Sequence, residues 1–184
     1  MAVLTPLANV PGTMIEQVLD AAFGEDRHAR TAYRLREGAE WLDALSFAVL
    51  DDEEYLAGTI QLWPVALTTP AGRSHPLIMI GPVAVLPAYQ GQGFGKALMA
   101  AALGALDGAD RNTAILPQVM IGDPDYYGRF FGFTAAPTAR WRCPGPVDPV
   151  RLLVRCDNPA ILPREGVLGA WPDDVNGKAM AGSR

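Results

Sequence analysis

Three glycines alternate with other residues just before an apolar stripe of helical spacing. The segment reads Gln90-Gly91-Gln92-Gly93-Phe94-Gly95-Lys96. Glycine permits positive φ and close backbone approach, and the first turn of a helix leaves N–H groups without partners. The helix dipole adds about half a positive charge at the same end. The segment therefore predicts a phosphate-binding loop of main-chain amides, which a chain of net charge −5 can use without basic side chains.

Three ligand-binding patterns compete for this segment. A dinucleotide fold uses G-x-G-x-x-G with an acid about 20 residues later, and the glycine spacing here departs from that pattern. A nucleotide P-loop uses G-x-x-x-x-G-K-[ST]; Gly95 and Lys96 match its end, but Ala97 replaces the hydroxyl residue and Gln90 replaces the first glycine. The third pattern, Q/R-x-x-G-x-G/A, is matched at every defined position by Gln90, Gly93 and Gly95.

The elements on either side of the loop must position it. Before it, Leu77 to Leu86 is a nearly continuous apolar run, which is typical of a central strand covered on both faces. Gly81-Pro82 interrupts the run, so we expect this strand to lose regular pairing about halfway along. After the loop, one broad apolar stripe predicts a helix that packs on the sheet. The stripe consists of Phe94, Ala97, Leu98, Ala101, Ala102, Ala105 and Leu106.

The remaining elements alternate in type along the chain, and their order predicts one mixed sheet with helices on both faces. The acidic tetrad 51–54 is expected to be the solvated turn of an antiparallel hairpin rather than a site for a basic substrate. The expected elements are a weak strand at 3–4, helices over 14–22 and 29–38, strands over 46–50, 55–67 and 113–120, a short helix or turn over 125–131, and strands from 133 onward and over 151–156.

Composition narrows the class of protein. With 184 residues, 49% of them hydrophobic and 19% charged, the chain is expected to fold as one domain and is not disordered. A net charge of −5 disfavours non-specific binding of nucleic acid. The longest apolar stretch, 77–88, is shorter than the roughly 20 residues of a spanning helix, so no membrane segment is expected. Cys143 and Cys156 are expected to pack in the core, which fits a cytoplasmic location.

In two segments the chain resembles the GCN5-related N-acetyltransferase (GNAT) superfamily. Residues 81–98 resemble that family's acetyl-CoA motif with its preceding strand, and Tyr126 to Phe133 resemble its second motif, a tyrosine followed by a Gly-Phe pair. The resemblance implies a GNAT-like acyl-CoA acyltransferase fold over residues 1–156. Its central mixed sheet is mostly antiparallel, splayed at the cofactor strand and covered by helices on both faces. Residues 157–184 are expected to be a C-terminal extension without clear structure.

The resemblance also implies a function and a binding site. Acetyl-CoA would be the cosubstrate, and the acetyl group would pass to a primary amine of a small molecule or peptide by direct attack on the thioester. Main-chain groups of Val83, Ala84 and Val85 would bind the pantetheine arm. The pyrophosphate would lie on amides of Gln90, Gly91, Gln92, Gly93, Phe94, Gly95 and Lys96. The Lys96 side chain would either add charge or simply face the solvent.

Tyr127 is the first candidate for the general acid that protonates the leaving thiolate, because a tyrosine with a pKa near 10 keeps its proton at neutral pH. Tyr126 is the second candidate, since the family pattern has one residue where Phe130-Phe131 stand here. Both tyrosines could instead only pack against these phenylalanines. A backbone donor near Val85 could stabilise the oxyanion.

Other roles stay open. Candidates for a general base are Asp123, Asp125, His75 and water. No Cys/His spacing predicts a metal site, and no G-x-S-x-G elbow predicts a serine hydrolase. The acceptor groove is expected near Trp41 to Ala48, Trp63 and residues 135–146.

Two other functions compete with catalysis. One is a non-catalytic acyl-CoA-binding or sensing module of the same fold, and the other is a dinucleotide-binding protein. The glycine loop alone does not separate the first of these from an enzyme. A homodimer through the late strands is expected only by analogy.

Overall fold

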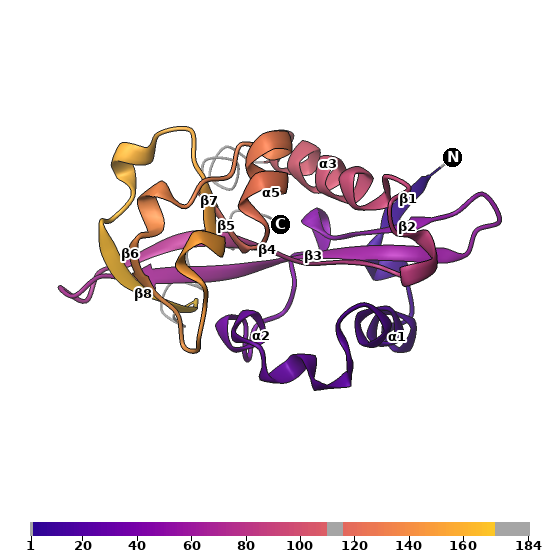
Figure 1. The fold of residues 1–184 in the computed structure, drawn as a ribbon, viewed down its shortest axis with the longest axis horizontal. Helices are drawn as coiled ribbons and strands as arrows, with labels where there is room; N and C mark the ends of the chain where they lie inside the picture. The colour runs from indigo at the N-terminus through magenta and orange to yellow at the C-terminus, as the bar shows by residue number, and fades with distance from the viewer. Residues whose placement is uncertain (1, 110–115, 172–184) are drawn as a thin grey trace. The chain divides into compact units, whose positions relative to one another are not determined.

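The structure, a computed structural model, describes residues 2–109 and 116–171. These residues form a mixed sheet with α-helices on both faces (Figure 1), which confirms the expected fold class. The strands are β1 (Val3–Pro6), β2 (Phe47–Leu50), β3 (Leu56–Thr68), β4 (Ser74–Val85), β5 (Gln118–Ile121), β6 (Arg140–Arg142), β7 (Leu152–Arg155) and β8 (Glu165–Ala170). The α-helices are α1 (Gly12–Phe23), α2 (Thr31–Leu35), α3 (Phe94–Asp107) and α5 (Pro124–Phe131).

The strand order is β1-β2-β3-β4-β5-β7, and β8 pairs with both β3 and β6. Antiparallel pairing joins β1 to β2, β2 to β3, β3 to β8 and β5 to β7, whereas β4–β5 and β6–β8 are parallel. The sheet is therefore mixed and mostly antiparallel, as expected.

Backbone contacts divide the chain into two compact units. The first unit comprises the described residues of 1–29, 41–62 and 80–109, and the second those of 30–40, 63–79 and 110–184. The two long strands, β3 and β4, each contribute one part to each unit. Each unit is described by itself below.

In the first unit, α1 and α3 lie on opposite faces of the strands (Figure 1). β1 pairs with β2 from Val3↔Leu50 to Pro6↔Phe47, and β2 pairs with β3 with a bulge between Val49 and Leu50. The predicted hairpin is therefore present, and so are the predicted helices α1 and α3. The helices have nearly the predicted bounds, because their apolar periodicity is long and regular.

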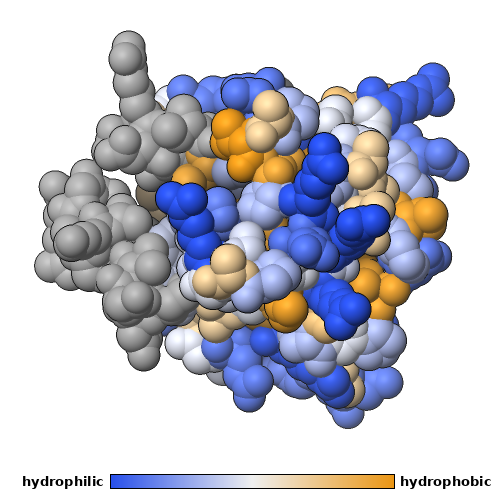
Figure 2. Space-filling view, turned by 90° about the vertical axis from the view of Figure 1, so that its left-hand side faces the viewer, coloured by the Kyte–Doolittle hydropathy of each residue, from blue (hydrophilic) through white to orange (hydrophobic). Residues whose placement is uncertain are grey.

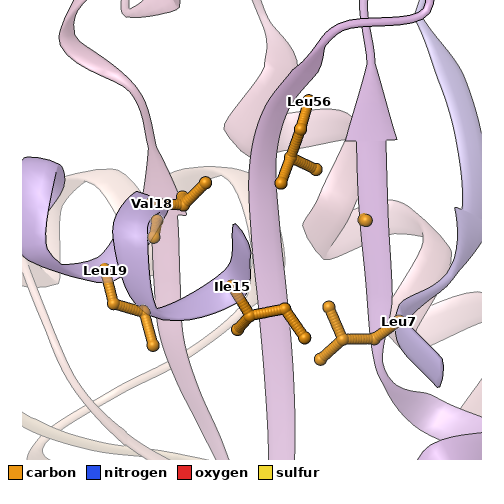
Figure 3. Packing of buried hydrophobic residues seen from close by; sticks show 7 residues of the cluster. Leu7, Ile15, Val18, Leu19 and Leu56 are labelled. Carbon is orange, nitrogen blue, oxygen red and sulfur yellow. The ribbon is translucent and has the colours of Figure 1, made fainter. Parts of the chain in front are cut away.

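A hydrophobic cluster joins α1 to the strands of this unit. Val18 of α1 points toward Leu56 of β3, Ile15 points toward Leu7, and Leu19 belongs to the same buried cluster (Figure 3). Ala84, near the end of β4, belongs to the same cluster and is fully buried. Burying a Leu or Ile side chain is worth about 1.5–3 kcal/mol, so α1 stabilises the strand that precedes the glycine loop.

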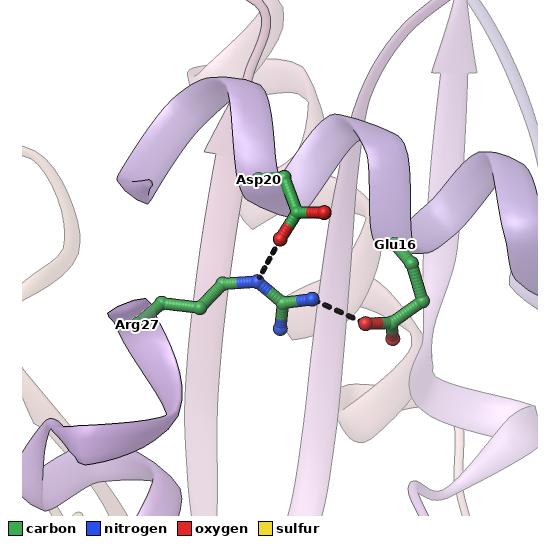
Figure 4. A network of polar contacts seen from close by, with 3 residues as sticks. All are labelled: Glu16, Asp20 and Arg27. Atoms are coloured by element: carbon green, nitrogen blue, oxygen red, sulfur yellow. Dashed lines mark hydrogen bonds and ion pairs between the residues drawn. The ribbon is translucent and has the colours of Figure 1, made fainter. Parts of the chain in front are cut away.

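A buried arginine joins the next turn to α1. Arg27 lies in a 3-10 turn (Glu25–Ala29) and is only 1% exposed. Its Nε donates to Asp20 Oδ1 at 3.0 Å and its Nη2 pairs with Glu16, so the guanidinium bridges carboxylates one turn apart on α1 (Figure 4). A buried charge persists only when it is paired in this way.

The second unit holds β5 to β8 together with the neighbouring parts of β3 and β4. In this unit α2 and α5 lie on opposite faces of the strands (Figure 1). Figure 2 shows the end of the unit that carries β6 and β8, where hydrophobic residues form separate patches among hydrophilic ones. None of the helices in the described ranges has the length and hydropathy that crossing a membrane requires.

The interpretation that no clear element follows Asn158 is wrong for residues 159–170. This segment contains a 3-10 turn (Pro159–Ile161) and strand β8, which pairs with β3 from Val65↔Ala170 to Thr68↔Val167. Gly166 is required there, because a Cβ would lie 2.8 Å from the Thr68 carbonyl oxygen and from Leu67 Cγ. Two glycines in a six-residue strand hide its alternation. The boundary of the expected domain at residue 156 stays a prediction.

Three other expectations differ from the structure. The helix expected over 29–38 is shorter, since α2 covers Thr31–Leu35 and follows a 3-10 turn. The strand expected from Phe133 is reduced to an isolated bridge between Thr134 and Val154, followed by β6. The strand expected over 113–120 begins at Gln118, and its first three residues lie outside the described ranges.

We predict that Arg27→Ala lowers the free energy of unfolding by about 2–3 kcal/mol, because it removes a buried charge pair and its packing. Thermal and urea unfolding would measure the loss. The matched control is Arg73→Ala at an exposed turn position, where the change should stay within about 0.5 kcal/mol. Equal stability of the two variants would contradict the bridging role of Arg27.

Candidate active site

The strand that leads to the glycine loop leaves its parallel partner before the loop begins. The register between β4 and β5 covers Ile78↔Gln118 and Met79↔Val119, and among the described residues it does not extend past Met79. Gly81, two residues further along, has φ +128°, a conformation that glycine tolerates. The predicted loss of regular pairing halfway along this strand is confirmed.

Val83, Ala84 and Val85 form the end of β4, close to β3. Leu86 N donates to Ala57 O at 2.9 Å. Gly58 lies so near to β4 that a Cβ at this position would be 2.5 Å from Ala84 O. Sequence reasoning missed Gly58, because nothing local marks a glycine whose role is to admit another strand's carbonyl. This close approach fixes the backbone that was predicted to bind pantetheine.

The glycine loop has the left-handed conformations that its sequence predicts. Gly91 has φ +77° and Gly93 has φ +87°. Gly93 is the N-cap of α3, and its carbonyl accepts the first helical bond from Ala97 N at 3.1 Å. Gly91, Gln92 and Gly93 are exposed, and the N–H groups of a first helical turn have no acceptor within the helix. The main chain here can therefore donate to an anion.

Two glutamine side chains attach the loop to the segment before it. Gln90 Nε2 donates to Val85 O at 3.2 Å, and Gln92 Nε2 donates to Ala88 O at 3.1 Å. The first bond links the loop directly to the end of β4. A carbonyl oxygen has two lone pairs, so Val85 O can still accept a second donor.

The charge of the first unit favours amides over cations as phosphate ligands. The Lys and Arg residues in its ranges are Arg27 and Lys96. Arg27 is paired with two carboxylates, whereas Lys96 is exposed in the first turn of α3. Lys96 is thus the basic side chain of this unit that is placed beside the loop.

The two candidate tyrosines lie in the second unit, on α5. Asp123 caps this helix by accepting from Asp125 N at 3.0 Å, and Pro124 occupies the first helical position. Tyr127 N donates to Asp123 O at 3.0 Å. The ring of Tyr127 covers Gly122, where a Cβ would lie 2.7 Å from ring atoms Cδ2 and Cε2. Gly122 therefore leaves the space that the ring occupies.

The surroundings of the two tyrosines differ. Tyr126 packs edge-on against Phe130 at 5.2 Å between ring centroids and against Tyr127 at 4.9 Å. Burial raises the pKa of Tyr127 to about 12, and the neighbouring Tyr126 and Asp123 add to this shift. Burial also raises the pKa of Tyr126. Both phenols are protonated at neutral pH, and Tyr127 is the more deeply buried of the two.

These features coincide with a match to a known family. The sequence model described as the acetyltransferase (GNAT) family matches residues 13–133. The chain belongs to the GNAT acetyltransferase family.

Solved structures of this family resemble the chain over most of its length. A GNAT family N-acetyltransferase (YhbS) from Escherichia coli, in complex with CoA, is 26% identical with a TM-score of 0.66 over 93% of this chain and 89% of that one. A GNAT family acetyltransferase from Brucella melitensis, in complex with acetyl-CoA, is 24% identical with a TM-score of 0.60 over 95% and 98%. No curated protein sequence matches the chain.

Within this GNAT chain, all ten predicted cofactor-binding residues lie in the first unit and both tyrosines in the second. The candidates for a general base in the second unit are Asp123 and Asp125, both exposed, and His75, which lines a small apolar pocket with Leu67 and Pro163. Across the described ranges, no group of three or more His, Cys, Asp and Glu residues could hold a metal ion.

We predict that Gly58→Ala weakens the affinity of this GNAT chain for acetyl-CoA and lowers its melting temperature. The new methyl group would collide with the Ala84 carbonyl oxygen of β4, and overpacking of this kind costs about 1–3 kcal/mol. Calorimetry and thermal unfolding would measure both effects. In the control, Gly104→Ala on α3, a Cβ meets nothing within 4 Å. This change should stabilise the helix by roughly 0.5–1 kcal/mol. An affinity for acetyl-CoA that Gly58→Ala leaves unchanged would show that the strand position is not critical.

Proposed function

We propose that the chain is an acetyl-CoA-dependent N-acetyltransferase that acts on a primary amine of a small molecule or peptide. The observation that carries the proposal is the glycine loop. Residues 90–93 are exposed and lead into α3, and the strand before them has left its parallel partner. The CoA and acetyl-CoA complexes of the two similar GNAT structures support it.

The cosubstrate would bind mainly to the backbone. Main-chain groups of Val83, Ala84 and Val85 would hold the pantetheine arm in the manner of an added strand. The pyrophosphate would accept hydrogen bonds from the amides of residues 90–96, where the helix dipole favours negative charge. Lys96 would add one positive charge. The dinucleotide alternative has no support from the spacing of these glycines.

The reaction begins when the neutral amine attacks the thioester carbon. A C–N bond forms, and the carbonyl oxygen becomes an oxyanion, which a backbone donor near Val85 would stabilise. The C–S bond then breaks and its electron pair stays on sulfur. One proton must reach the thiolate and one must leave the acylated nitrogen, so the products are an amide and the free thiol of coenzyme A.

Tyr127 would supply the proton to sulfur. Its raised pKa of about 12 keeps it protonated until negative charge develops. Since a thiol has an ordinary pKa near 8.5, proton donation by such a phenol is uphill unless the phenol is reprotonated. The proton lost by the nitrogen can meet this need, directly or through water. Tyr127 therefore acts as a hydrogen-bond donor first and as an acid only when the C–S bond breaks.

A cytoplasmic location and a homodimer remain predictions. The acceptor groove predicted near Trp41 to Ala48, Trp63 and residues 135–146 also remains a prediction. A panel of small amines and peptides, assayed for free-thiol release with acetyl-CoA, would identify the acceptor class. No thiol release by any amine, combined with measurable binding of acetyl-CoA, would favour the non-catalytic module.

We predict that Tyr127→Phe lowers turnover by about 10²-fold or more, as loss of a general acid does, while the Kd for acetyl-CoA changes less than about twofold. Thiol release and calorimetry would measure the two quantities. Tyr126→Phe is the matched control, because it removes the neighbouring hydroxyl from the same helix, and its effect should be much smaller. A larger loss in Tyr126→Phe would exchange the two roles.

We also predict a pH dependence of stability that belongs to Tyr127. Its pKa is about 12 in the folded chain and near 10 when unfolded, so its contribution to stability is complete below about pH 10. Between pH 10 and 12 the unfolded state releases the proton more easily, and the native chain loses stability. Melting temperatures measured from pH 8 to 11.5 should therefore fall faster for the wild-type chain than for Tyr127→Phe. Parallel curves would mean that the phenol is not buried.

A further inference from the structure

The carboxylate of Asp51 accepts hydrogen bonds from two parts of the first unit. Its Oδ1 accepts from the N–H groups of Glu53 and Tyr55, each at 2.9 Å, which holds the turn between β2 and β3. Its Oδ2 accepts from the hydroxyl of Tyr89 at 2.7 Å. Its place in the acidic tetrad predicts a solvated residue at the tip of the hairpin, but the structure shows that Asp51 also has a bonding role. One carboxylate connects that turn to the segment just before the glycine loop.

Tyr89 is the last residue of a 3-10 turn (Pro87–Tyr89) that leads directly into the loop. Its ring meets the ring of Phe94 edge to face, with centroids 5.6 Å apart and an interplanar angle of 89°. Phe94 is the first residue of α3. The two aromatic residues that flank residues 90–93 thus contact each other and close the loop at its base.

Such an anchor matters because the loop contains glycine at two left-handed positions. A glycine-rich segment loses more conformational entropy on ordering than other sequences, and a ligand that must order it binds more weakly. The Tyr89 hydroxyl lowers the pKa of Asp51, so the carboxylate is ionised at neutral pH. A hydrogen bond from a phenol to a carboxylate is about twice as strong as a neutral one.

We propose that Asp51 and Tyr89 are positioning residues for coenzyme A binding: their hydrogen bond holds the glycine loop in the conformation that receives the pyrophosphate. Neither side chain needs to touch the cosubstrate. They act by keeping the loop ordered before the ligand arrives. The inference rests on the proposed function, because it assigns the pair a role only if the loop binds coenzyme A.

The test compares single and double variants by calorimetry with coenzyme A. Tyr89→Phe removes the hydroxyl and keeps the ring contact with Phe94, so the Kd should rise roughly 3–10-fold. Asp51→Asn keeps an acceptor for the turn amides but loses the charge-assisted bond to Tyr89, so its Kd should rise by a similar factor. Adding Tyr89→Phe to Asp51→Asn should change the Kd by less than about twofold, because the charge-assisted bond is already lost.

Hydrogen–deuterium exchange of the unliganded chain provides a second readout. Amides of residues 90–96 should exchange faster in Tyr89→Phe, whereas those of β5 and β7 should not. A general loss of stability would raise exchange in both regions, so this comparison separates positioning of the loop from a global effect.

Tyr55→Phe is the matched control, since it makes the same chemical change in the same hairpin at a residue that is 63% exposed. It should leave both the Kd and the exchange rates unchanged. A Kd for Tyr89→Phe within twofold of the wild-type value, or an equal effect of Tyr55→Phe, would overturn the proposal. If the wild-type chain binds no coenzyme A, the proposed function itself fails, so the two failures are distinguishable.

Discussion

Main-chain N–H groups hold an anion only when the backbone that carries them is fixed in a conformation that most residues avoid. Here that constraint falls on Gly91 and Gly93, both with positive φ, immediately before α3. Several neighbouring contacts help to hold the backbone of these two glycines in place. Gln90 and Gln92 bond back to the preceding segment, and the cluster under α1 includes Ala84 of the strand that leads to the loop. An acidic unit can in this way offer a site for a polyanion.

Much of this arrangement could be predicted from the sequence, because it depends on local patterns. The long apolar stripe of α3 and the run of β4 with its Gly81-Pro82 interruption are visible in consecutive residues, and both are found in the structure. The loop follows from three glycines at a helix start. All ten residues predicted to bind the cofactor lie between Val83 and Lys96, so this prediction needed no knowledge of long-range contacts.

The parts that were missed depend on partners far away in the sequence. Gly58 matters because of a carbonyl on another strand, and Asp51 because of a hydroxyl 38 residues later. The order of preference between Tyr126 and Tyr127 could not be tested from motif spacing. The structure shows only that their surroundings differ: Tyr127 covers Gly122 and has its pKa raised to about 12, while Tyr126 packs against Phe130.

Strand β8 has a consequence for how the chain is made. Val65 of β3 has Ala170 of β8 as its partner, and β8 also supports β6. During synthesis, this edge of β3 therefore stays unpaired until more than a hundred further residues, including β8, have left the ribosome. Unpaired strand edges favour association between chains, and pairings over long sequence distances form slowly. The nascent polypeptide is thus open to association with other chains from the time β3 emerges until β8 pairs with it.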